Sequence, residues 1–130
     1  MPRALAAAVL ASAMLAATAG GATGTARWFH SPTGNIACEL NVGRGLGTYA
    51  DCQTFEPPQT ATLRANGRTA TCAGSRCRIG NGPEDARTLP YGSSIRLAPF
   101  RCDSMRAGVR CVVAATGHGF TIAREGTRTF

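Results

Sequence analysis

Six cysteines constrain this chain more than any other feature of its sequence. All of them follow an N-terminal run of small and apolar residues, and they are Cys38, Cys52, Cys72, Cys77, Cys102 and Cys111. An even number of cysteines in an exported chain is typical of a disulfide framework rather than of reactive thiols. Several pairings are possible in principle. Pairing of sequence neighbours predicts Cys38–Cys52, Cys72–Cys77 and Cys102–Cys111.

The N-terminus has the pattern of a signal peptide. A positive charge at Arg3 precedes an unbroken run of small and apolar residues, and a small-x-small triplet ends at Ala19. This predicts a signal peptide over residues 1–19, with cleavage after Ala22 or Ala26 as alternatives. The run is too short and too rich in alanine for a stable membrane span. We therefore expect a secreted or periplasmic protein with no membrane span in its mature form.

The cysteine spacing does not favour a metal site. Tetrahedral zinc sites usually draw on two close ligand pairs of the C-x-x-C type. Here Cys72 and Cys77 enclose four residues, Cys102 and Cys111 enclose eight, and no C-x-x-C occurs. No phosphate-binding or calcium-binding loop motif is present either. We expect neither a metal nor a cofactor.

The mature chain is predicted to be mainly β. Residues 20–25 contain only Gly, Ala and Thr, which predicts a flexible lead-in over residues 20–27 and a single disulfide-bonded domain over residues 28–130. No later stretch keeps a helical period, whereas short alternating or β-branched runs recur between turn residues. The fold class is a small disulfide-stabilised antiparallel sheet domain, and the sequence does not distinguish a barrel from a sandwich.

Turn residues and apolar positions give the expected layout of this domain. Asn66-Gly67 is the strongest hairpin signal in the chain, and Gly43, Gly45 and Gly47 predict a bend over residues 41–48. The predicted core consists of Phe29, Ile36, Leu40, Leu63, Leu89, Ile95, Leu97, Phe100, Val109, Val112, Phe120 and Ile122.

Charge points to anionic partners. All 14 basic residues are arginine and there are 7 acidic residues, giving a net charge of +7. Such a charge favours an anionic cell-envelope polymer or protein partner. The arginines are scattered along the sequence, without an aromatic-rich strand or a recognition helix, which argues against nucleic acid. A scattered pattern is also more typical of a solvated surface than of a binding stripe.

Four short motifs carry a resemblance to a known family. In order, they are S-P-T-G-N-I-A-C from Ser31 to Cys38, L-P-Y-G from Leu89 to Gly92, G-V-R-C from Gly108 to Cys111, and G-H-G-F from Gly117 to Phe120. With them, the chain from about Phe29 to Phe130 resembles a family of small exported bacterial proteins of unknown function. The chain departs from the family's pattern at residues 73–75 and 78–80. The resemblance implies export and brings no activity.

Few residues are candidates for chemistry. His118 lies between two glycines, so its imidazole is accessible for proton transfer, and Arg124 is a weaker companion. No partner base or nucleophile is identifiable, which favours a turn role for His118. Cell-wall transpeptidases also have a His-Gly pair, but their next residue is a nucleophilic cysteine, and here it is Phe120.

One pair of carboxylates also needs consideration. Glycoside hydrolysis uses two carboxyl groups, and Glu39 and Asp51 flank the predicted Cys38–Cys52 disulfide, so they are expected to be close in space. Ordinary salt bridges to arginine are the favoured interpretation of both.

The sequence thus favours a non-enzymatic binding or structural module of the extracytoplasmic space or cell envelope. A hydrolase using His118 is the alternative, and a secreted enzyme inhibitor is a weaker one.

Overall fold

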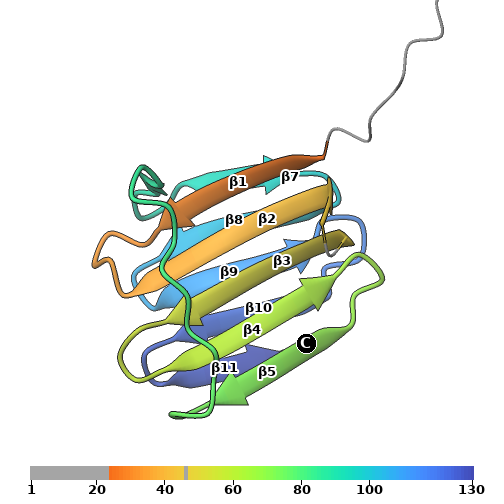
Figure 1. The fold of residues 1–130 in the computed structure, drawn as a ribbon. Coiled ribbons are helices and arrows are strands. Elements are labelled where there is room, and N and C mark those ends of the chain that lie inside the picture. The colour runs from red at the N-terminus through yellow and green to blue at the C-terminus, as the bar shows by residue number, and fades with distance from the viewer. Residues whose placement is uncertain (1–23, 46) are drawn as a thin grey trace, which may run out of the picture.

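The computed structural model describes residues 24–45 and 47–130, in which eleven strands form two sheets packed face to face (Figure 1). The first sheet has the order β5-β4-β3-β2-β1-β6 and contains β1 (Thr25–His30), β2 (Ile36–Arg44), β3 (Gly47–Thr54), β4 (Gln59–Arg64), β5 (Thr69–Ala73) and β6 (Arg87–Thr88). The second has the order β11-β10-β9-β8-β7 and contains β7 (Ser94–Leu97), β8 (Phe100–Met105), β9 (Gly108–Val113), β10 (Gly119–Ala123) and β11 (Gly126–Thr129).

The predicted fold class is confirmed, and the open choice of architecture is settled. Both sheets keep free edge strands and do not close into a barrel, so the domain is a sandwich. Neighbouring strands are antiparallel except for β1 and β6, which pair in parallel through Phe29 with Arg87 and His30 with Thr88. None of the described segments forms a helix long and apolar enough to span a membrane.

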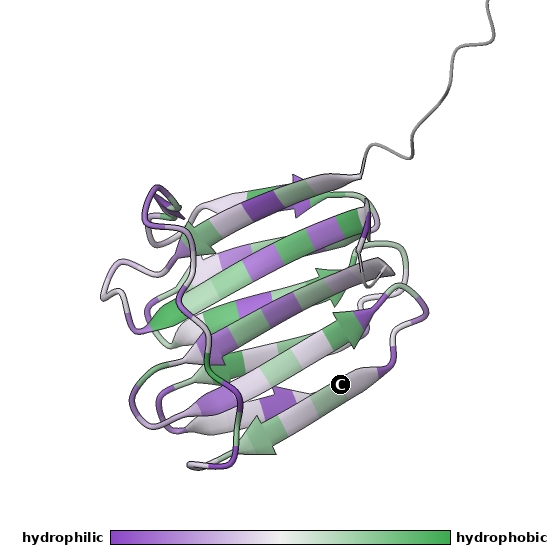
Figure 2. Cartoon of the chain, in the orientation of Figure 1, coloured by the Kyte–Doolittle hydropathy of each residue, from purple (hydrophilic) through white to green (hydrophobic). Residues whose placement is uncertain are grey.

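The core lies between the sheets because side chains alternate along each strand. In β3, Ala50, Cys52 and Thr54 are buried, whereas the residues between them are partly exposed. Figure 2 shows this alternation as changes of colour along the strands. Every predicted core residue is buried except Leu97, which is partly buried and packs against the core. Val112 is buried but lies outside the core cluster.

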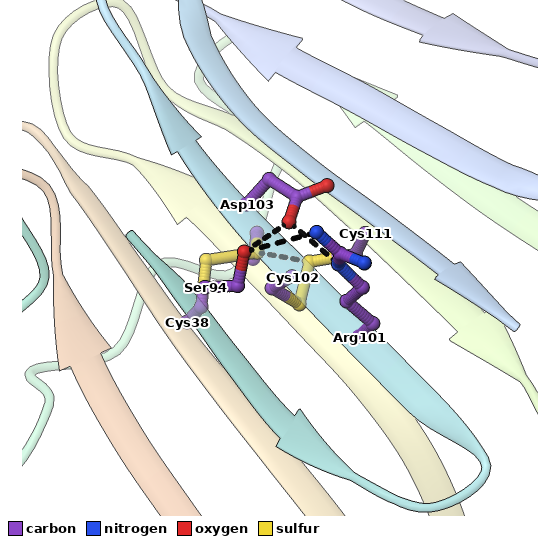
Figure 3. Close-up of a disulfide and its surroundings, with 7 residues drawn as sticks. Cys38, Ser94, Arg101, Cys102, Asp103 and Cys111 are labelled. Carbon is purple, nitrogen blue, oxygen red and sulfur yellow. Dashed lines mark hydrogen bonds and ion pairs between the residues drawn. A yellow bond between two sulfur atoms is a disulfide. The ribbon is translucent and has the colours of Figure 1, made fainter. Parts of the chain in front are cut away.

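All three predicted disulfides are confirmed. Cys38–Cys52 joins β2 to β3 and Cys102–Cys111 joins β8 to β9, in each case between directly opposed residues whose Cα atoms are 4.1 Å apart. The two disulfides belong to different sheets, yet Cys52 Sγ lies 3.7 Å from Cys111 Sγ (Figure 3). Cys72–Cys77 closes the turn that follows β5.

The expected flexible lead-in is too long. The first strand begins at Thr25, which pairs with Val42, so residues 25–27 belong to the sheet and not to a flexible lead-in. The predicted signal peptide, residues 1–19, lies outside the described residues.

The predicted bend over residues 41–48 is also shorter than expected, because β2 continues to Arg44. An irregularity between Asn41 and Arg44 lets the strand continue through Gly43, whose φ of 71° suits glycine. The Asn41 amide donates hydrogen bonds to the carbonyls of Arg44 and Gly47 and thereby closes the hairpin.

The two cross-strand disulfides are expected to stabilise the domain more than the third. Replacing Cys102 and Cys111 together by alanine removes a chain constraint worth about 3 kcal/mol and leaves a void where Cys111 meets Cys52. We expect the free energy of unfolding, measured by urea denaturation, to fall by about 3–5 kcal/mol. The matched double replacement of Cys72 and Cys77, whose loop is shorter and more exposed, should cost about 2 kcal/mol or less. Equal losses in the two variants would contradict this ranking.

Candidate functional site

The structure separates the two residues that the sequence proposes for catalysis. His118 immediately precedes β10, and Arg124 immediately follows it. Because β10 spans the five residues between them, the two residues are six steps apart, or about 20 Å at the usual rise of a strand. They do not share a site.

The contacts of His118 are those of a turn residue. It is exposed, its backbone N–H is 3.3 Å from Thr116 Oγ1, and its carbonyl accepts a hydrogen bond from the Val113 N–H. Its side chain lies against Gly67 in the β4–β5 turn, close enough that a Cβ at Gly67 would be 3.3 Å from His118 Cβ. The imidazole thus lies beside a turn of the other sheet, which supports the turn interpretation.

The first and last of the four sequence motifs, Ser31 to Cys38 and Gly117 to Phe120, form turns and close contacts between strands. The Ser31 hydroxyl accepts a hydrogen bond from the Ile36 N–H at 3.1 Å. The Asn35 side chain bonds both the N–H and the carbonyl of Glu56, at 2.9 and 3.0 Å. At Gly119 a Cβ would collide with the Cys111 carbonyl, so only glycine fits beside β9 there. These contacts give the motifs structural roles.

Arginines gather on the outer face of the five-stranded sheet. On the first three strands the arginines are flanked by residues that are buried or partly buried, and strand register places the fourth on the same face; they are Arg96 on β7, Arg101 on β8, Arg110 on β9 and Arg128 on β11. Arg96 pairs in register with Arg101, and Thr121 lies between Arg110 and Arg128. We call these four residues the arginine face. Arginines scattered in sequence are thus brought together by strand pairing.

One carboxylate is embedded in the arginine face. Asp103 accepts hydrogen bonds from Ser94 Oγ at 2.5 Å and from Arg101 Nε at 2.8 Å (Figure 3). Partial burial tends to raise the pKa of Asp103, but the hydrogen bonds from Ser94 and Arg101 outweigh it, so that the pKa lies below its ordinary value of 3.8. Asp103 stays ionised at neutral pH and holds Arg101 in place.

An aromatic ring borders this face. Phe130 pairs with Gly119 through two backbone hydrogen bonds, and the guanidinium carbon of Arg110 lies 5.0 Å from its ring centroid. Such a cation–π contact orients the guanidinium and leaves its outer edge free to donate hydrogen bonds. Within the described part of the chain the only ion pair is Arg101–Asp103. The arginine face therefore keeps three guanidinium groups that are not ion-paired.

Glu39 and Asp51 are neighbours, as expected, because they are directly opposed on β2 and β3. The favoured salt bridges are not formed, since neither carboxylate takes part in an ion pair in the described residues. Both lie on the outer face of the six-stranded sheet, away from His118 and from the arginine face.

Among the described residues, three cysteine sulfur atoms lie close enough together to resemble a metal site. Those of Cys38, Cys52 and Cys111 lie within 4.8 Å of one another. All three are oxidised in disulfides, whereas metals are bound by thiolates. The cluster is a packing contact.

Comparison with known protein families, curated proteins and solved structures finds no match to this chain. The choice of the arginine face as the candidate site therefore depends on its geometry. Sequence reasoning missed it by treating the arginines as scattered. The available signal was their alternation with buried residues, as at Arg110 between Val109 and Cys111.

Replacing Asp103 by asparagine tests its contacts. The lowered pKa of Asp103 contributes stability that is present above pH 3.8 and lost as the pH falls through the folded value. Because the group is still partly exposed to solvent, we expect the variant to lose only about 0.5–1 kcal/mol of unfolding free energy at pH 7. The difference from the unmodified protein, followed by urea denaturation, should shrink as the pH falls below 3.8. A difference that is unchanged at pH 2 would contradict the role, and Asp85→Asn serves as a control at an exposed acid elsewhere.

Proposed function

We propose that this protein is a non-enzymatic binding module of the extracytoplasmic space, whose partner is an anionic cell-envelope polymer. The observation that carries the proposal is the arginine face, where four arginines and one aspartate leave three net positive charges on one side of the sandwich. Guanidinium groups suit carboxylate and phosphate ligands because they donate paired hydrogen bonds.

The spacing of the face suits a polymer. Neighbouring strands are about 4.8 Å apart, so Arg96 on β7 and Arg128 on β11 are separated by about 19 Å at the backbone. An extended chain that carries one anionic group on each repeat would meet several of these arginines at once. Weak contacts repeated along one chain add to a useful affinity.

The same sheet makes the face rigid. Arg101 is held by Asp103, and Arg110 lies over Phe130. Side chains that are already ordered lose less conformational entropy when a ligand binds. This favours a binding surface over a merely solvated one.

A secreted or periplasmic location is part of the proposal. Three disulfides are typical of proteins that fold in an oxidising compartment. A hydrolase using His118 receives no support, because the imidazole lies against the β4–β5 turn and Arg124 lies at the far end of β10.

Binding to two defined polyanions tests the proposal. We expect labelled polygalacturonate, which carries carboxylates, or polyphosphate to bind at low ionic strength, and the affinity to fall steeply as salt rises. Replacing Arg110 and Arg128 together by alanine should weaken binding at least about tenfold, or 1.4 kcal/mol. Fluorescence anisotropy measures both effects, and the preferred polymer distinguishes carboxylate from phosphate chemistry.

The control removes the same charge from elsewhere. Arg68 and Arg76 are exposed and lie outside the arginine face, so their joint replacement by alanine should weaken binding much less. An equal loss of affinity in the two double variants would indicate that binding depends on net charge alone, which would contradict the proposal. Binding to anionic lipid vesicles but to neither polymer would also contradict it.

A further inference from the structure

The segment between β5 and β6 crosses the outer face of the six-stranded sheet. Figure 1 shows it passing over the ends of several strands as it runs from one edge of the sheet to the other. Its first part is tied down by Cys72–Cys77 and by the hydrogen bond from the Gly74 N–H to the Pro58 carbonyl. We call residues 74–86 the strap.

The middle of the strap is fixed to β3. The Gln53 side chain donates to the Gly80 carbonyl and accepts from the Gly80 N–H, the latter at 2.9 Å. A side-chain amide that bonds both backbone groups of one residue fixes that residue much as a neighbouring strand would. The strap therefore has a defined position over the sheet.

A pocket of about 390 Å³ opens between the strap and the sheet. Trp28, Glu39 and Asp51 line it from the sheet, and Arg78 and Asn81 line it from the strap. The volume falls within the range of about 300–1,000 Å³ that is common for small-molecule sites.

The sheet side of the pocket is one cross-strand row. Trp28 is paired in register with Glu39, and Glu39 with Asp51, so the three side chains stand next to one another at intervals of about 4.8 Å. Trp28 is 37% exposed, although it is the only tryptophan in the chain. An aromatic surface thus lies directly beside the Glu39 carboxylate, with the Asp51 carboxylate one strand further along the row.

The two carboxylates are unusual for a structural pair. Like charges directly opposite each other on neighbouring strands destabilise a sheet, and no arginine forms an ion pair with either of them in the described residues. Burial raises the pKa of Asp51 against the opposing effects of Thr62 and Arg64. Burial also raises the pKa of Glu39, against the opposing effects of a hydrogen bond from Tyr49 and the charge of Arg44, and the neighbouring Asp51 adds to the rise. This arrangement costs stability, which is common at functional sites.

We propose that this pocket binds one ring of a neutral saccharide. A sugar ring has apolar C–H faces that can stack on the Trp28 indole, and hydroxyl groups that can donate to Glu39 and Asp51 and accept from Arg78. Acceptors and donors on opposite walls suit a ligand that is both donor and acceptor at every position. The carboxylates repel the polyanion proposed for the arginine face, so this is a second and chemically distinct site.

The single tryptophan gives the test a direct signal. Chitotetraose and cellotetraose, two neutral oligosaccharides, are titrated into the full protein while Trp28 fluorescence and binding heat are recorded. At least one should give a saturable change that is insensitive to salt. Glu39→Gln and Asp51→Asn should each weaken binding at least about tenfold, because an amide accepts at one atom only. Trp28→Ala should abolish the binding heat.

Thermal unfolding separates loss of binding from loss of fold. Because the pKa values of Glu39 and Asp51 are raised, their ionised forms destabilise the folded state above the ordinary values of 4.5 and 3.8. The two amide variants should therefore unfold at a higher temperature than the unmodified protein at pH 7, while binding less. Glu125→Gln, which removes an exposed acid outside the pocket, should change neither property.

The outcomes distinguish this proposal from the polyanion proposal. The Arg110 and Arg128 double variant should bind the oligosaccharide normally, so failure of one site leaves the other intact. If neither oligosaccharide changes Trp28 fluorescence or gives heat at millimolar concentration, the pocket is not a saccharide site. Unchanged binding by both amide variants would likewise overturn the proposal.

Discussion

The contact between two disulfides from different sheets is the interaction on which the rest of this structure depends. Cys38–Cys52 and Cys102–Cys111 each lock one hairpin in register, and Cys52 and Cys111 then meet at 3.7 Å in the centre of the core. A one-residue slip in either hairpin would turn its side chains to the opposite face. The covalent links prevent such slips, so the outer faces are defined along with the core.

The two outer faces have different chemistry. The five-stranded sheet presents arginines, with Asp103 and Phe130 holding two of them. The six-stranded sheet presents a tryptophan and two carboxylates beneath the strap. The net charge of the chain conceals this division, because it adds a basic face to one that carries two acids without an ion pair among the described residues.

Local features were predictable from the sequence, and features that depend on strand order were not. The disulfides and the Asn66-Gly67 turn follow from residues close together in the chain. The closeness of Glu39 and Asp51 followed from the first disulfide. The arginine face required knowledge that β7 to β11 form one sheet, and the strap required the distant pairing of β1 with β6. His118 drew attention through its flanking glycines, but Gly117 serves the turn through its φ of 76° and Gly119 serves close packing against β9.

The sandwich places its two faces back to back. Packed sheets are about 10 Å apart, and the close-packed core, with Cys52 Sγ 3.7 Å from Cys111 Sγ, holds them at this distance. Occupants of the two faces would therefore share no side chain and would not compete. The domain would hold them at a fixed separation, as a rigid spacer does, without the variable reach of a flexible linker.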